Sequence, residues 1–83
     1  MRQQKRKLIL WLKFRPEHAQ TKLGTAKFHE PYKHHYQKAR LMEKLLLLAQ
    51  KHREAGRIWQ FRIYDQPGNN ILESWAQYQN STD

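Results

Sequence analysis

The 83-residue chain contains no cysteine, little glycine and proline, and no long hydrophobic run. Without cysteine, disulfide bonds, thiolate zinc sites and thiol nucleophiles are excluded. The longest apolar runs, 8–12 and 45–49, are five residues long, whereas a membrane-spanning helix needs about 20. We therefore expect no membrane span. We also expect a cytoplasmic protein, because the basic and apolar residues at the start lack the small-residue cleavage site of a signal peptide.

Acidic residues are scarce as well. Seven Asp and Glu stand against sixteen Lys and Arg, and the formal net charge is +9. Residues 1–15 carry six basic residues and no acid, whereas 56–83 carry two basic residues and three acids. Hydrophobic residues make up 39% of the chain and aromatic residues 12%, which is too much for a disordered polycation. The sequence predicts one small domain whose N-terminal two-thirds faces an anionic partner.

Hydrophobic periodicity predicts the order of the elements. Apolar side chains alternate over 7–14, which indicates a strand, and recur every three or four residues between Pro31 and Gly56, which indicates a helix. Alternation resumes after Gly56 on both sides of a segment rich in turn-forming residues. The expected elements are a basic arm over 1–6, a strand over 7–14, a loop over 15–30 with at most a short strand near 22–28, a helix over 31–55, a hairpin with strands over 57–65 and 71–78, and a flexible tail over 79–83.

This order predicts an α+β fold of the type β-α-β-β, a three-stranded sheet with one long helix packed on one face. A right-handed crossover would make strand 7–14 parallel to strand 57–65. The phase of the last strand is ambiguous, and one choice places Trp75 away from the helix. Residues expected to face the helix are Leu8, Leu10, Leu12, Phe14, Trp59, Phe61 and Ile63, whereas Ile9, Trp11, Arg62 and Tyr64 would lie on the opposite, uncovered face.

Basic residues interleaved with aromatic ones favour nucleic-acid binding. Lysine and arginine neutralise phosphates, and exposed aromatic rings stack on unpaired bases. A sheet with aromatic side chains is one known surface for single-stranded RNA, although no recognised nucleic-acid-binding motif is present. We expect a small non-catalytic protein that binds RNA or DNA. The candidate contact residues are Arg2, Lys5, Arg6, Lys7, Trp11, Lys13, Arg15, Lys22, Lys27, Lys33, His34, Arg62 and Tyr64.

Other interpretations remain open at this point. The aromatic residues could fill a core or a homodimer interface, and the basic surface could belong to an adaptor or inhibitor that binds an acidic protein. A toxin-type endoribonuclease is a further alternative, because the chain has five histidines. No two of them have the four-residue spacing that places two metal ligands on one helical face, and we expect neither a metal nor a cofactor. Lys33 and His34, at the positive end of the helix, are a candidate phosphate site.

Overall fold

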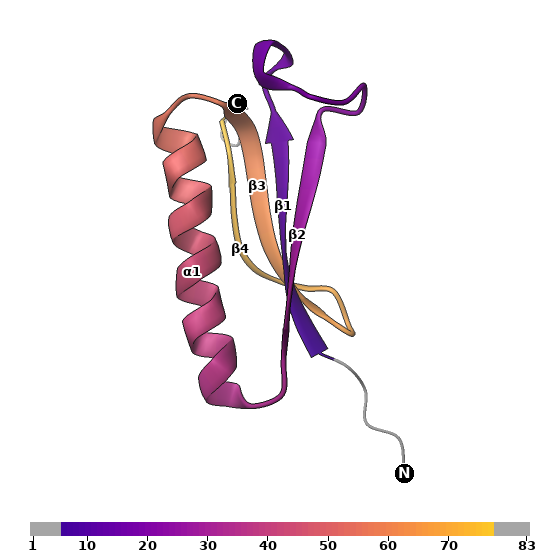
Figure 1. The fold of residues 1–83 in the computed structure, drawn as a ribbon, viewed down its shortest axis with the longest axis vertical. Helices are drawn as coiled ribbons and strands as arrows, with labels where there is room; N and C mark the ends of the chain where they lie inside the picture. Colours follow the sequence, from indigo (N-terminus) through magenta and orange to yellow (C-terminus); the bar gives the residue numbers. More distant parts are fainter. Residues whose placement is uncertain (1–5, 78–83) are drawn as a thin grey trace, which may run out of the picture.

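The computed structural model describes residues 6–77, in which one α-helix packs on one face of a four-stranded antiparallel sheet (Figure 1). The α+β class and the single helix agree with the sequence prediction. The strands lie side by side in the order β2-β1-β3-β4. In chain order the elements are β1 (Arg6–Phe14), the short 3-10 helix η1 (Pro16–His18), β2 (Thr25–Tyr32), α1 (His35–Glu54), β3 (Ile58–Gln66) and β4 (Asn70–Ala76).

The predicted number of strands was wrong, because the sheet has four strands and not three. The additional strand is β2, which lies largely within the segment 15–30 that we expected to be a loop. It forms an antiparallel hairpin with β1, so the chain has already reversed once before it enters α1. Consequently β1 is antiparallel to β3, not parallel to it as predicted. The crossover through α1 joins β2 to β3, which lie on either side of β1.

The helix is shorter at its start than the predicted range 31–55. Residues 31 and 32 still belong to β2, and α1 begins only at His35. The side chain of Gln37 accepts hydrogen bonds from the backbone amides of Lys33 and His34, at 2.8 and 3.0 Å, which satisfies two donors at the helix start. After α1, Gly56 has a φ of +70°, the left-handed conformation that commonly ends a helix.

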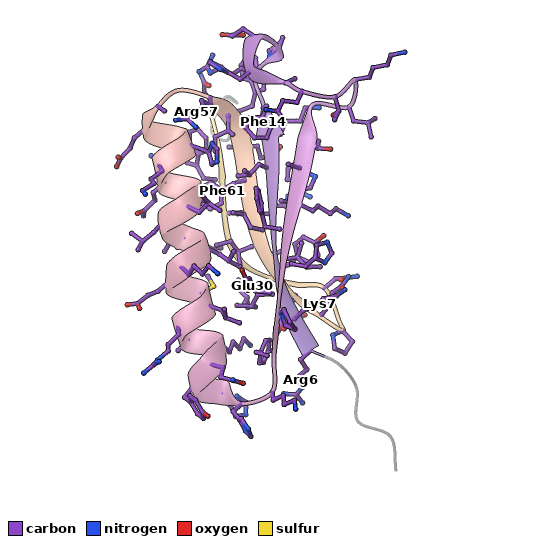
Figure 2. The ribbon with its side chains drawn as sticks, in the orientation of Figure 1. Arg6, Lys7, Phe14, Glu30, Arg57 and Phe61 are labelled. Carbon is purple, nitrogen blue, oxygen red and sulfur yellow. The ribbon has the colours of Figure 1, made fainter. Side chains whose placement is uncertain are left out.

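The core lies between α1 and the sheet. Phe61 lies in this layer, whereas Lys7 is on the side of the sheet away from the helix (Figure 2). The leucines of β1 and two residues of β3 face the helix as predicted. The buried core residues are Leu8, Leu10, Leu12, Tyr32, Leu45, Ala49, Ile58, Phe61 and Ile63.

The structure corrects the predicted orientation of Trp59 and decides that of Trp75, which the sequence left ambiguous. Lys13 is paired with Gln60, but Phe14 is paired with Ile58, so the register shifts at Trp59. Ile58 therefore occupies the core position that we had expected for Trp59. On β4, Trp75 lies on the helix side, where its ring centroid is 6.3 Å from that of Phe61. Trp75 is therefore not part of the uncovered face.

Candidate nucleic-acid interface

The face of the sheet opposite α1 is called the open face here. No second layer covers it within residues 6–77, because α1 is the only α-helix there and packs on the other side (Figure 1). Strand pairing defines its residues, since paired residues of neighbouring strands point to the same face. The open face consists of Lys7, Ile9, Trp11 and Lys13 on β1, Thr25, Lys27, His29 and Pro31 on β2, Gln60, Arg62, Tyr64 and Gln66 on β3, and Ile71, Ser74 and Ala76 on β4.

Trp11 is at the centre of the open face, between two basic residues. On β1 it is paired with Lys27 of β2 on one side and with Arg62 of β3 on the other. The guanidinium carbon of Arg62 lies 5.1 Å from the centroid of the Trp11 ring. A cation–π contact of this kind at an exposed position contributes about 0.5–1 kcal/mol. Lys27, Trp11 and Arg62 therefore form a row across three strands, with a cation on each side of the aromatic ring. The guanidinium of Arg62 lies over that ring.

A buried apolar residue, Ile9, lies on the open face next to Trp11 on β1. Ile9 is paired with His29 of β2 and with Tyr64 of β3. Its side chain is only 1% exposed, because its neighbours on the strand and across the strands enclose it. Tyr64 is a diagonal neighbour of Trp11, at a Cα separation of about 7–8 Å for such pairs. The open face thus combines a packed apolar centre with polar and basic side chains around it.

Charge is segregated between the two faces of the sheet. The open face carries four cations, Lys7, Lys13, Lys27 and Arg62, and none of its described positions holds an acid. The acidic residues of the strands all occupy positions of the opposite phase, since Glu30 and Asp65 are paired with Leu8 and Glu73 is paired with Ile63. The Lys, Arg, Asp and Glu side chains at the described positions of the open face are therefore all cations.

Two of those acids are neutralised by α1. Lys44 forms an ion pair with Glu30 at 2.7 Å, and Lys38 forms one with Asp65 at 2.8 Å. Asp65 also accepts a hydrogen bond from the hydroxyl of Tyr32 at 2.8 Å. These helix lysines are used inside the domain, whereas the cations of the open face point away from it.

Arg15 and Lys22 lie beyond the end of β1. The guanidinium carbon of Arg15 is 4.8 Å from the Trp59 ring centroid, and its Nη2 donates a hydrogen bond to Gln77 at 2.6 Å. Lys22 is exposed on the segment between β1 and β2. The strand registers therefore do not place either side chain on the open face.

Arg6, Lys33 and His34 are not part of the open face. Arg6 is paired with Tyr32 and so has the phase of the helix-facing residues. Lys33 and His34 precede α1, and the Gln37 side chain already occupies their backbone amides. The ring of His34 stacks on Tyr36, with centroids 5.5 Å apart. The remaining candidates, Arg2 and Lys5, together with the predicted tail 79–83, lie outside the described residues.

Sequence reasoning did not assign His29 and Ile71 to this surface. His29 shares its face with Lys27 on β2, and the alternation of these residues with Phe28 and Glu30 is the signal that β2 offered. Ile71 is 57% exposed at the margin of the open face. These residues add an aromatic nitrogen donor or acceptor and an apolar contact to the surface.

His52 lies near the end of α1 and contacts the end of β1. Burial, together with the nearby positive charge of Arg57, lowers the pKa of His52. Its ring meets that of Phe14 edge-on, with centroids 5.6 Å apart. Within residues 6–77, no group of three or more His, Asp or Glu side chains has an arrangement that could hold a metal ion. The contact with Phe14 places the His52 ring between α1 and the end of β1.

No protein-family model, curated protein or solved structure matches the chain. No helix within residues 6–77 has the length and apolar character that are needed to cross a membrane. The function is therefore inferred from the arrangement of the chain's own residues, above all from the charge and the aromatic side chains of the open face.

Proposed function

We propose that this chain is a non-catalytic nucleic-acid-binding protein and that the open face is its contact surface. One observation carries the proposal: four cations surround Trp11 and Tyr64 on a sheet face that has no acid and no covering layer within the described residues. Cations on such a surface bind phosphates and release the counterions condensed on the nucleic acid.

The outer surface of α1 provides the contrast that supports this assignment. Arg40 and Lys51 are exposed there, but so are Glu43 and Glu54, and Leu47 is 61% exposed. Interspersed charges of both signs are typical of a solvated helix surface. The open face instead has one sign of charge, which favours a polyanionic ligand.

The proposal is tested by the salt dependence of binding in two matched double variants. Lys13→Gln/Lys27→Gln removes two cations from the open face, and Arg40→Gln/Lys51→Gln removes two from the helix. All four side chains are exposed, and both variants have the same net charge. Dissociation constants for a fluorescent single-stranded oligonucleotide are measured by anisotropy between 50 and 200 mM salt. The first variant should flatten the slope of log K against log salt by about 1.4, or about 0.7 for each cation, and the control should change it little.

Three results would contradict the proposal. Equal slopes for both double variants would mean that only total charge matters. No binding of any nucleic acid at 50 mM salt, combined with binding to polyglutamate, would favour the adaptor or inhibitor of an acidic protein. Cleavage of RNA during the titration would point instead to the endoribonuclease alternative.

A further inference from the structure

We infer that the ligand of the open face is a single-stranded nucleic acid, one of whose unpaired bases stacks on Trp11 in the position that the Arg62 guanidinium occupies in the free protein. This inference rests on the proposed function and specifies its ligand. It depends on three features of the described residues: the width of the sheet, the position of Trp11 within it, and the contact between Arg62 and the Trp11 ring.

The width of the sheet disfavours a duplex. The major groove of B-DNA is about 12 Å wide and admits a helix or a two-stranded ribbon. Four strands spaced by about 4.8 Å span about 14 Å between the outer backbones alone. Trp11 lies on β1, an inner strand of this sheet, so the major groove of undistorted B-DNA does not receive the part of the surface that carries the ring. Without the energetic cost of widening a groove, the open face touches a duplex at its outer phosphates.

The position of the ring favours an unpaired base. A base in a duplex is stacked between its neighbours and offers only its edges to a protein, whereas an unpaired base offers its flat face to an aromatic side chain. Lys27 and Arg62 lie on the two sides of Trp11, where they can reach the phosphates that precede and follow such a base. Tyr64, one diagonal step away, offers a second ring to the next base.

The contact between Arg62 and Trp11 is the one that a stacking base would replace. The guanidinium lies over the ring at 5.1 Å, and Arg62 is exposed on a face whose described positions hold no acid. An exposed cation–π contact is weaker than the stacking of a base on an aromatic side chain. Replacement of the Arg62 guanidinium by a base on the Trp11 ring is therefore favourable. It also frees the guanidinium, whose N–H donors match the oxygens of a phosphate. Arg62 would act as a temporary cover of the ring that becomes a phosphate ligand.

The outer surface of α1 is less suited to a polyanion than the open face. Its exposed residues include the acids Glu43 and Glu54 among the cations Arg40, Lys44, Lys51 and Arg53, and carboxylates repel phosphates. The charges at the described positions of the open face are instead all positive.

The test compares a 12-nucleotide single strand with the duplex of the same sequence, both fluorescently labelled, at 50 mM salt. The unaltered protein should bind the single strand at least tenfold more tightly. Trp11→Leu should weaken single-strand binding about 5- to 150-fold and leave duplex binding unchanged. Trp11→Phe, which keeps a ring, should retain most of the affinity. Trp75→Phe, which alters a tryptophan on the helix side, serves as the control.

Arg62 provides a second measurement that does not depend on removing the tryptophan. Arg62→Lys keeps the charge but not the planar guanidinium, so the salt slope should be unchanged, whereas Arg62→Gln should flatten it by about 0.7. An unchanged slope for Arg62→Gln would overturn the assigned role of this side chain. Circular dichroism and thermal unfolding establish that each variant is folded.

The outcomes separate this inference from the proposed function. Equal affinity for single strand and duplex, or no effect of Trp11→Leu in a folded protein, overturns the inference while the double variants at Lys13 and Lys27 still test the function. Absence of binding to either nucleic acid overturns both. If Trp11→Leu does not fold, the comparison of single strand with duplex on the unaltered protein decides.

Discussion

Replacing Asp65 with asparagine or with alanine should separate two contributions to the stability of the fold. Asp65 lies on β3 and accepts hydrogen bonds from the Tyr32 hydroxyl on β2 and from Lys38 Nζ on α1, both at 2.8 Å. One carboxylate thus connects three elements of the domain. The side chains of Lys38 and Asp65 are 31% and 16% exposed, whereas Tyr32 is 6% exposed.

These differences in exposure set the expected magnitudes. Asp65→Asn keeps an acceptor for Tyr32 and loses only the charge facing Lys38, which can turn toward water. This loss should cost about 1 kcal/mol of unfolding free energy, the upper end of the range for exposed ion pairs, because this pair is partly buried. Asp65→Ala also leaves the buried Tyr32 hydroxyl without this acceptor, which adds about 1–3 kcal/mol. The alanine variant should therefore lose about 2–4 kcal/mol.

The pH dependence provides an independent check on the same cluster. Burial alone would raise the pKa of Asp65, but the hydrogen bonds from Lys38 and Tyr32 and the nearby positive charges outweigh it and lower the pKa. A lowered carboxyl pKa stabilises the fold above the ordinary value near 3.8, and that stability is lost as the pH falls through the folded-state pKa. The difference between the unaltered protein and Asp65→Asn should therefore shrink in acid.

At alkaline pH the relevant pKa shifts have the opposite direction, because the pKa values of Tyr32 and Lys38 are raised. Burial, and then the hydrogen bond to Asp65, raise the pKa of Tyr32, and the hydrogen bond to Asp65 raises the pKa of Lys38. A raised pKa in either group stabilises the fold below the ordinary value, and this stability is lost as the pH rises through the folded-state pKa. Stability should therefore decline above about pH 10, because the ordinary values are 10.0 and 10.5.

The assay is urea denaturation followed by tryptophan fluorescence, at pH 7 and at intervals from pH 3 to 11. Tyr32→Phe is the matched control, because it removes the hydroxyl and leaves the ion pair. Equal losses for Asp65→Asn and Asp65→Ala would refute the assigned role of the Tyr32 hydrogen bond. A difference between the unaltered protein and Asp65→Asn that does not change between pH 7 and pH 3 would refute the charge contribution of Asp65.

Three further predictions concern α1 and its ends. Leu45→Ala should lower the unfolding free energy by about 2–5 kcal/mol, because the side chain is 1% exposed in the core, whereas Leu47→Ala, 61% exposed, should change it by at most about 0.5 kcal/mol in the same urea assay. Because the pKa of His52 is lowered, the fold should lose stability as the pH falls below the ordinary value of 6.5 and through the folded-state pKa, and thermal unfolding of His52→Phe should lack this change between pH 7 and 5. Gly56→Ala should lower the unfolding free energy by about 1–2 kcal/mol, because the backbone φ at this position is +70°. The added Cβ would meet no atom within 4 Å, so this cost is one of backbone conformation, and an unchanged melting temperature would contradict it.

Periodicity was sufficient to predict the strongly patterned parts of the fold. The leucines of β1 are buried as the pattern predicts, and so are Leu45 and Ala49 in the middle of α1. At the start of α1 the prediction was wrong, because Tyr36, which the same pattern places on the buried side, is 66% exposed. Ile9, Trp11, Arg62 and Tyr64 lie on the face predicted for them. This part of the open face was predictable because both strands keep a regular alternation over these residues.

The strand β2 and the register of the sheet could not be predicted, because both depend on which strands pair with one another. β2 is an edge strand with polar residues on both faces and with Pro31 inside it, a residue that an edge strand tolerates. The register shifts at Trp59 and between Ile63 and Tyr64 alter which residues face the core. Such shifts are properties of a strand pair, so counting alternate residues through them gives the wrong phase.

The segregation of acids from the open face was also hidden in the sequence. Glu30 and Asp65 lie far apart in the chain, yet both are paired with Leu8. Only the register places them in the same phase, opposite to Lys7 and Lys13. Net charge and its distribution along the chain predicted a basic protein, but the surface that uses this charge becomes visible only when the strands are aligned.

The inner position of β1 has a consequence for how the domain is made. One neighbour of β1, β2, follows it directly, but the other, β3, begins 44 residues after Phe14. At a synthesis rate of about 5–20 residues per second, one edge of β1 waits about 2–9 s for its partner. During that time the run Leu8–Leu12 is a template for pairing with another nascent copy. Lys7 and Lys13 bracket this run, and their charges repel a second copy before any ligand surface exists.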